Sequence, residues 1–169
     1  MFSKELESVK DAFFEAMQNG WASGNDGEPI EELPGWKQIT HNTSDGKHQV
    51  VDRWGKDATG TPTGSTLITS SRGILEWVMW YGGDSYEKGA ILFLRRSLME
   101  NYSKGIFCGG RGPEQISNHR FNYYNKFNGD FRHFKGNEFI GEYSNHGDRE
   151  EHNGVGGHRY WGGSLLYLS

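Results

Sequence analysis

The sequence predicts an α+β fold in which two units pack as a pseudo-twofold pair in one compact domain. Each unit is a helix followed by a three-stranded antiparallel meander. Three observations lead to this prediction. A chain of 169 residues suits a single core. Two segments have helical periodicity, and each is followed by a block of short strands with Gly-rich turns.

The first unit begins with a helix at residues 4–19, where apolar residues recur at helical spacing and Ser3 can cap the start. Residues 22–46 are rich in Gly, Asn and Asp, which predicts a loop. Strands are expected at residues 49–54, 65–69 and 74–81.

The second unit repeats this order. An apolar stripe after Gly83 predicts a second helix, and a Gly-rich connection follows at residues 101–119. Strands are expected at residues 120–128, 131–134 or 136–143, 158–161 and 164–168, with an excursion at roughly residues 144–157. The single domain at 1–169 therefore divides into residues 1–47, 48–83, 84–119 and 120–169.

The two strand blocks resemble each other in sequence, which indicates an internal repeat. The aligned segments are residues 50–57 with 123–130, 64–68 with 136–140, and 80–83 with 160–163. Neither block can bury its apolar face alone, so we expect the two to pack together.

These residues also carry a family resemblance. The chain resembles an uncharacterised bacterial family, a domain of unknown function found alone or behind helix-turn-helix domains. The matching motifs are Tyr123, Gly129-Asp130, residues 134–140, Tyr160-Trp161-Gly162-Gly163, Arg111-Gly112-Pro113 and residues 77–82. The resemblance covers roughly residues 48–168 and implies the fold but no activity. The chain departs from the family at Gly64-Ser65-Thr66, where the first copy often has Gly-x-Glu, and it has no helix-turn-helix segment.

Charge and composition narrow the possible partners. The formal net charge is -4, which argues against a dedicated nucleic-acid binder. A single cysteine, Cys108, fits a reducing compartment. No signal peptide and no bilayer-length apolar run is recognised. We therefore expect a cytoplasmic protein with no membrane and no nucleic-acid partner.

Histidines cluster in and after the excursion, at His146, His152 and His158. Imidazoles and carboxylates can ligate zinc, but this spacing matches no standard motif. A solvated loop is the favoured interpretation, so we predict no metal and no cofactor.

Carboxylates offer a second kind of chemistry. Asp57 and Asp130 occupy equivalent turns of the predicted repeat and could act as an acid–base pair. An Asp in such a turn usually accepts hydrogen bonds from its own backbone, and this is the favoured interpretation. Glu138 can point inward from its strand and would then need a partner. The candidate partners are Arg111, Arg159 and Lys126.

Cys108 precedes Gly109-Gly110-Arg111. The glycines could form an oxyanion hole and Arg111 could lower the pKa of the thiol. A lone cysteine is more often a small buried hydrophobe, and no partner histidine is identified by spacing.

Aromatic residues make up 14% of the chain, an excess over an ordinary core that favours a binding function. We predict a non-enzymatic binding domain with an aromatic-lined groove for a small ligand or a protein partner. The expected lining residues are Trp54, Trp80, Arg111, Tyr123, Glu138 and Tyr160. The alternatives are a small hydrolase-like enzyme that uses Glu138, Asp130 or a histidine, and a protein-interaction or inhibitory factor. A homodimer is possible in either case.

Overall fold

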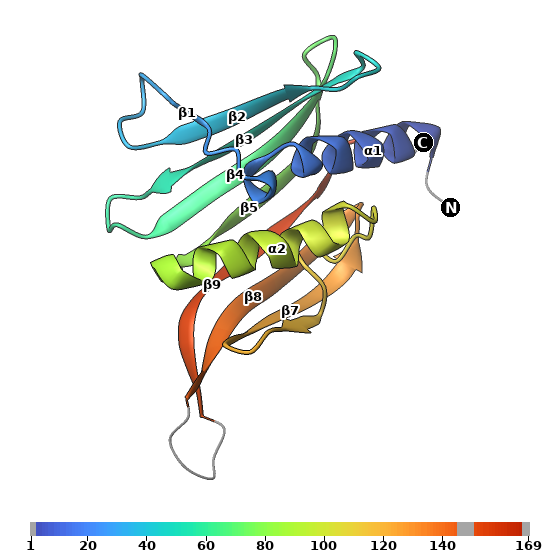
Figure 1. Cartoon of the computed structure of the whole chain (residues 1–169). Coiled ribbons are helices and arrows are strands. Elements are labelled where there is room, and N and C mark those ends of the chain that lie inside the picture. The colour runs from blue at the N-terminus through green and yellow to red at the C-terminus, as the bar shows by residue number, and fades with distance from the viewer. Residues whose placement is uncertain (1–2, 145–150, 167–169) are drawn as a thin grey trace.

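In the described residues, nine strands form a single antiparallel sheet, and two α-helices lie on one face of it (Figure 1). This computed structural model describes residues 3–144 and 151–166, with the backbone alone at 144 and 151–153. Within the described chain, no helix is long and apolar enough to cross a membrane.

The elements follow one another along the chain in two runs, each opened by an α-helix. The first run is α1 (Lys4–Gln18), β1 (Glu28–Pro29), β2 (Lys37–Asn42), β3 (His48–Lys56), β4 (Pro62–Ser70) and β5 (Leu75–Asp84). The second run is α2 (Ile91–Tyr102), β6 (Gln115–Ser117), β7 (Phe121–Asp130), β8 (His133–Ser144) and β9 (Glu151–Ser164). Short 3-10 turns lie at Trp21–Ser23 and Lys88–Ala90.

The two runs meet in the middle of the sheet. The strand order is β1-β2-β3-β4-β5-β9-β8-β7-β6, so β5 and β9 join the halves. Trp80 lies opposite Trp161 and Tyr81 lies opposite Tyr160 in this central pair. Backbone pairing is therefore continuous across the domain.

The core lies between the sheet and the helices. The ring centroid of Phe13 in α1 is 5.1 Å from that of Trp77 in β5, and Trp77 stacks on Phe131 at 4.9 Å. The indole N–H of Trp77 donates to the carbonyl of Phe131 at 3.0 Å. Because buried Trp needs a hydrogen-bond acceptor as well as apolar neighbours, this contact fixes the β5 side chain against the β7–β8 turn.

Several strand predictions are wrong in detail. Residues 22–46, predicted as a loop, contain β1 and β2, because the alternation in Lys37–Asn42 is too short and polar to stand out. The Gly-rich connection includes β6. Of the predicted excursion at 144–157, residues 145–150 lie outside the described residues. Ser144 belongs to β8 and residues 151–157 belong to β9, which also includes the predicted strand at 158–161.

The end of the predicted repeat is also out of register. The predicted repeat pairs Trp80 with Tyr160, yet Trp80 is 45% exposed and Tyr160 is 1% exposed. Side chains alternate across a strand, so these two residues face opposite sides of the sheet.

Candidate functional site

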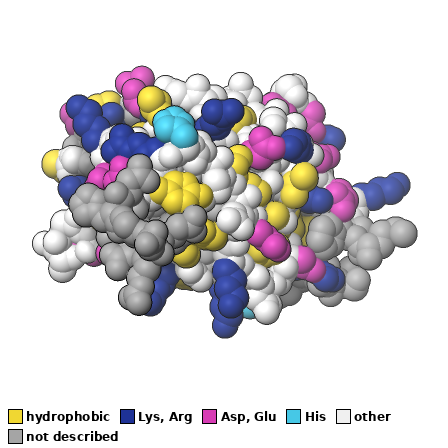
Figure 2. All heavy atoms as spheres, turned by 60° about the horizontal axis from the view of Figure 1, so that its bottom comes forward, with side chains coloured by type: hydrophobic (Ala, Val, Ile, Leu, Met, Phe, Trp, Pro, Cys, Tyr) yellow, Lys and Arg dark blue, Asp and Glu magenta, His cyan; other side chains and the backbone are white. Residues whose placement is uncertain are grey.

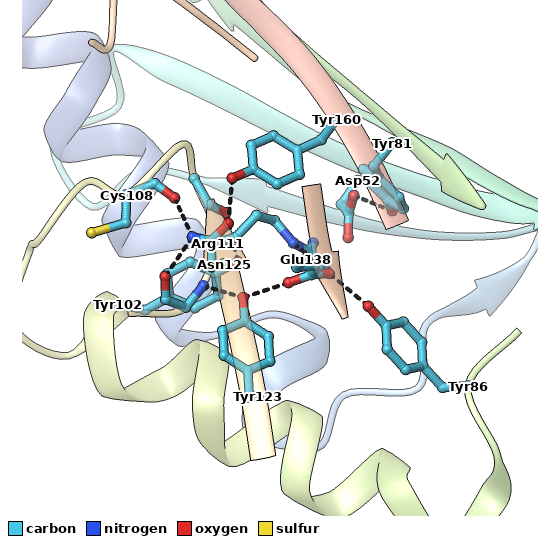
Figure 3. Close-up of polar contacts among 12 residues, drawn as sticks. Asp52, Tyr81, Tyr86, Tyr102, Cys108, Arg111, Tyr123, Asn125, Glu138 and Tyr160 are labelled. Carbon is cyan, nitrogen blue, oxygen red and sulfur yellow. Dashed lines mark hydrogen bonds and ion pairs between the residues drawn. The ribbon is translucent and has the colours of Figure 1, made fainter. Parts of the chain in front are cut away.

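A buried ion pair, Arg111–Glu138, lies between the helices and the sheet (Figure 3). Alternation along β8 turns Glu138 inward, where its side chain is fully covered. Arg111 Nε donates to Glu138 Oε1 at 3.0 Å, and Nη2 donates to the same oxygen. The hydroxyl of Tyr86 donates to Oε1 at 2.9 Å, and that of Tyr123 donates to Oε2 at 2.5 Å.

These contacts set the charge state of the pair. Burial by itself raises the pKa of Glu138, but the charge and hydrogen bonds of Arg111 hold this pKa below its usual value. Burial opposes the charge on Arg111 as well, and Glu138 raises the pKa of the guanidinium above its usual value. Both groups are therefore ionised, and each neutralises the other.

The loop at residues 108–112 delivers Arg111 to this position. Gly109 and Gly110 have φ values of 66° and 72°, which L side chains rarely adopt, and a Cβ on Gly109 would lie 2.5 Å from the ring of Tyr160. Asn125 of β7 donates to the carbonyls of Cys108 and Gly112 at 2.9 and 2.8 Å. The loop is thus fastened to the second half of the sheet.

Beside the ion pair is a cavity of about 400 Å³ that lies between the end of α1, one side of α2 along its length and strands β3–β5. Its floor is apolar and its walls are aromatic. The apolar residues include Met17, Met79, Ile91, Leu94 and Leu98, and the aromatic residues are Trp21, Trp54, Tyr81, Tyr86 and Tyr102. The cavity has the size and lining typical of small-molecule sites.

Asp52 supplies a carboxyl group to the cavity wall. Its Oδ1 accepts hydrogen bonds from the Tyr81 hydroxyl at 2.9 Å and from Thr66 Oγ1 at 3.0 Å. The Tyr81 ring can lie across β4 because Gly64 has no side chain: a Cβ there would meet the ring at 2.5 Å. Burial raises the pKa of Asp52, and the bonds from Tyr81 and Thr66 oppose that rise.

His158 of β9 lies on the same wall. Its ring centroid is 6.0 Å from that of Tyr81 and 4.8 Å from that of Tyr86. Both ring nitrogens are buried and have no hydrogen-bond partner among the described residues. Burial and the neighbouring Arg111 lower the pKa of His158 to about 4, so the ring is neutral at pH 7.

The predicted lining residues fall into three groups. Trp54 and Arg111 line the cavity. Glu138 accepts a hydrogen bond from Arg111, and Tyr123 donates one to Glu138, so both residues lie next to the cavity residue Arg111. The other two residues lie apart: Tyr160 is buried against Asn125, and Trp80 is exposed on the face opposite the helices.

The alternative catalytic residues have ordinary structural partners. Asp57 accepts the backbone N–H groups of Thr59 and Thr61, and Asp130 accepts that of Arg132. Both turn carboxylates therefore bond their own backbone, as favoured. Burial raises the pKa of Cys108, which is the opposite of what activation of the thiol by Arg111 would require.

Residues 145–150, including His146, lie outside the described residues, and the side chain of His152 is not described. Among described side chains, no group of three His, Cys, Asp or Glu residues is placed to hold a metal ion. Of the three histidines considered, His158 is the one the structure places at a site.

The predicted lining residues leave out several polar residues of the cavity, among them Asp52, Tyr81, Tyr86 and His158. The signal for Asp52 was its position in an otherwise apolar alternation with Val50 and Trp54, which turn to the same face. No local pattern marks Tyr86, because it lies between elements and reaches Glu138 through the tertiary fold.

The fold and the site together define the class of this protein. It is an α+β domain in which the described helices cover one face of a single sheet, with a buried ion pair beside a cavity. The chain belongs to the family described as "Domain of unknown function (DUF5680)", which matches residues 63–163, more than half of its length. This match confirms the resemblance to an uncharacterised family; bacterial origin and fusion to helix-turn-helix domains stay predictions. Comparison with curated proteins and with solved structures gives no match.

Proposed function

We propose that the protein is a non-enzymatic small-molecule binding domain and that its ligand occupies the cavity beside Arg111. The observation that carries this proposal is unused hydrogen-bonding capacity inside an apolar cavity. Both ring nitrogens of His158 are buried, and neither has a hydrogen-bond partner in the part of the chain that the structure describes. A buried polar group without a partner costs roughly 1–3 kcal/mol, which a bound ligand would offset.

A comparison of the two halves gives this proposal further support. We propose that they are copies of one unit, with Asp52 equivalent to Asn125 and Tyr81 equivalent to Tyr160. The hydroxyl of Tyr81 bonds Asp52, and that of Tyr160 bonds Asn125. In the second half the 108–112 loop packs against this pair. In the first half the same position borders the cavity, so a ligand would take the place that the loop takes in the second half.

The hydrolase alternative has less support. Both oxygens of Glu138 accept hydrogen bonds, and its charge is balanced by Arg111. Asp130 is held in an exposed turn by Arg132. Neither carboxyl group is free to transfer a proton to a bound molecule.

The experiment is a binding titration with a neutral probe, 2-naphthalenemethanol, by isothermal titration calorimetry. Ala22 lines the cavity, so Ala22→Phe should fill part of it and weaken binding at least tenfold. Ala58 is exposed in the β3–β4 turn, so Ala58→Phe is the matched control and should bind like the unaltered protein. Equal binding by both variants would refute the cavity as the site.

Native mass spectrometry of gently purified protein should also show a retained added mass.

A second candidate function, protein interaction, rests on the outer face of the sheet. Trp80 and Trp161 lie directly opposite each other there and are 45% and 55% exposed. Described helices cover only the other face (Figure 1). Figure 2 shows that apolar side chains also reach the surface on the side of the β8–β9 hairpin, between charged groups. If a homodimer forms through the tryptophan pair, Trp161→Ser should convert it to monomer in sedimentation velocity.

A further inference from the structure

We propose that the cavity selects an organic cation, an ammonium group carried on a flat apolar ring, with Asp52 as its counter-charge. This inference rests on the proposed binding function and names the class of its ligand. It follows from the balance of charges around the cavity, from the free oxygen of Asp52 and from the aromatic walls.

The charges that face the cavity do not cancel. Arg111 is neutralised by Glu138 through two hydrogen bonds to one oxygen. Asp52 has no ion pair among the described residues: its partners are the hydroxyl groups of Tyr81 and Thr66. The other cation of the lining, Lys56, has an exposed side chain, so an ionised Asp52 leaves the inner part of the cavity with one negative charge in excess. Burying an uncompensated carboxylate is unfavourable, and a bound cation would remove that penalty.

Asp52 has an oxygen available for this contact. Both of its hydrogen bonds go to Oδ1, so Oδ2 accepts none from the described residues. Asp52 lines the cavity. An ammonium N–H could donate to Oδ2 without displacing Tyr81 or Thr66.

The walls suit the rest of such a ligand. Trp54, Tyr86 and Trp21 line the cavity, and aromatic faces attract cations through their quadrupoles. Arg95 already lies over the Trp21 ring at 4.6 Å, so Trp54 and Tyr86 are the rings that we assign to the cation. The indole of Trp54 is held against the backbone of Gly27, where a Cβ would lie 2.6 Å from the ring. The apolar floor formed by Leu94 and Leu98 would cover a flat hydrocarbon ring.

Three basic side chains line the cavity and could oppose a cation, and Arg95, which lies over the Trp21 ring, is paired with Asp26. Arg111 lies over the Tyr81 ring at 5.5 Å, but its charge is matched by Glu138. His158 is neutral at pH 7 because its pKa is lowered to about 4. Lys56 is an exposed side chain at the rim, where water screens its charge.

Three probes with the same naphthalene ring test the class of ligand. They are the cation (2-naphthylmethyl)trimethylammonium, neutral 2-naphthalenemethanol and the anion 2-naphthylacetate, compared by calorimetry at pH 7.5. The cation should bind at least tenfold more tightly than the neutral probe, and the anion more weakly than both. A quaternary ammonium has no N–H, so this probe measures charge selection alone; 2-naphthylmethylamine should bind more tightly still through Oδ2.

The variant Asp52→Asn should abolish the preference for the cation while it keeps the binding of the neutral probe. The matched control is Asp57→Asn, which removes the same charge from an exposed turn and should keep the preference. The unaltered protein provides an independent test: a cation that binds no better than the neutral probe would overturn the inference, whatever the variant does. If the neutral probe binds but the cation binds no better, the proposed ligand class is wrong, while the proposal that the cavity binds a small molecule is kept. If no probe binds, both proposals fail.

Discussion

At the scale of single residues, the Arg111–Glu138 pair is the strongest constraint in the interior. Glu138→Gln would leave the buried guanidinium without a counter-charge, which costs about 3–5 kcal/mol. We expect that loss in the free energy of unfolding measured with urea. The control is Glu100→Gln, which breaks the exposed Lys104–Glu100 pair and should cost about 1 kcal/mol or less. Equal losses in the two variants would show that the interior pair is not structural.

His158 makes stability depend on pH. The unfolded chain takes up a proton at this ring near pH 6.5, whereas the folded protein does so only near pH 4. Between these values the unfolded state binds more protons, so the free energy of unfolding falls as the pH drops. The full difference corresponds to about 3 kcal/mol.

The measurement is urea denaturation at pH 7.0 and 5.0 for the unaltered protein and for His158→Gln. The variant cannot titrate at this position, so it should lose less stability on acidification than the unaltered protein. Glu138 does not mimic the effect, because its lowered pKa affects stability only at more acidic pH. Parallel pH dependence in both proteins would rule out a buried neutral His158.

At the scale of elements, the alternation along β5 makes the two faces of the sheet energetically unequal. Trp77 is fully buried and stacked on Phe131, so Trp77→Ala should cost about 3–5 kcal/mol. Trp80 is on the outer face, and Trp80→Ala should cost about 1 kcal/mol or less. Thermal unfolding of the two variants measures the contrast, and a reversed order would mean that the strand is turned over.

The 108–112 loop is constrained by both its backbone and its neighbours. Gly109→Ala would strain a φ of 66° and push a methyl group into the ring of Tyr160. Gly46→Ala, in the β2–β3 turn, strains a φ of 70° with no atom within 4 Å, and should cost only about 1–2 kcal/mol. Gly109→Ala should therefore be clearly more destabilising in urea. A loss no larger than that of Gly46→Ala would mean that the loop moves away from Tyr160 at little cost.

The sequence predicts elements with strong periodicity and misses those set by tertiary contacts. The first helix is predicted at residues 4–19 and observed at Lys4–Gln18. The prediction is accurate because the apolar stripe and the Ser3 cap are local signals. Strand β2 is missed because its pairing with β3 supplies the order that its own sequence lacks. The charge of an inward Glu138 predicts a basic partner, and Arg111 is one of three candidates with Arg159 and Lys126; the tertiary fold selects Arg111. Tyr86 reaches Glu138 through the tertiary fold as well, and no local pattern marks it.

At the scale of the whole molecule, each half completes the core of the other. The ring of Phe13 lies 6.1 Å from that of Phe131, and Trp77 stacks on Phe134 at 5.5 Å, so rings of the first half are buried by rings of the second. Strands β5 and β9 would each become an unpaired edge if the halves were separated. Exposed apolar surface and open edges both disfavour a folded half.

Fragments 1–84 and 85–169 should therefore be unfolded alone and should fold when mixed. Separate NMR spectra should show narrow amide dispersion, and the mixture should recover the dispersion of the intact chain. Adding Trp77→Ala to the first fragment should weaken reassembly, because it removes the ring that stacks on Phe131 and Phe134 of the other fragment. Trp80→Ala in the first fragment should leave reassembly unchanged if the outer face of the sheet is not buried in the reassembled domain. A well-dispersed spectrum from either fragment alone would show that one half folds independently, and the halves would then be two domains sharing a sheet edge.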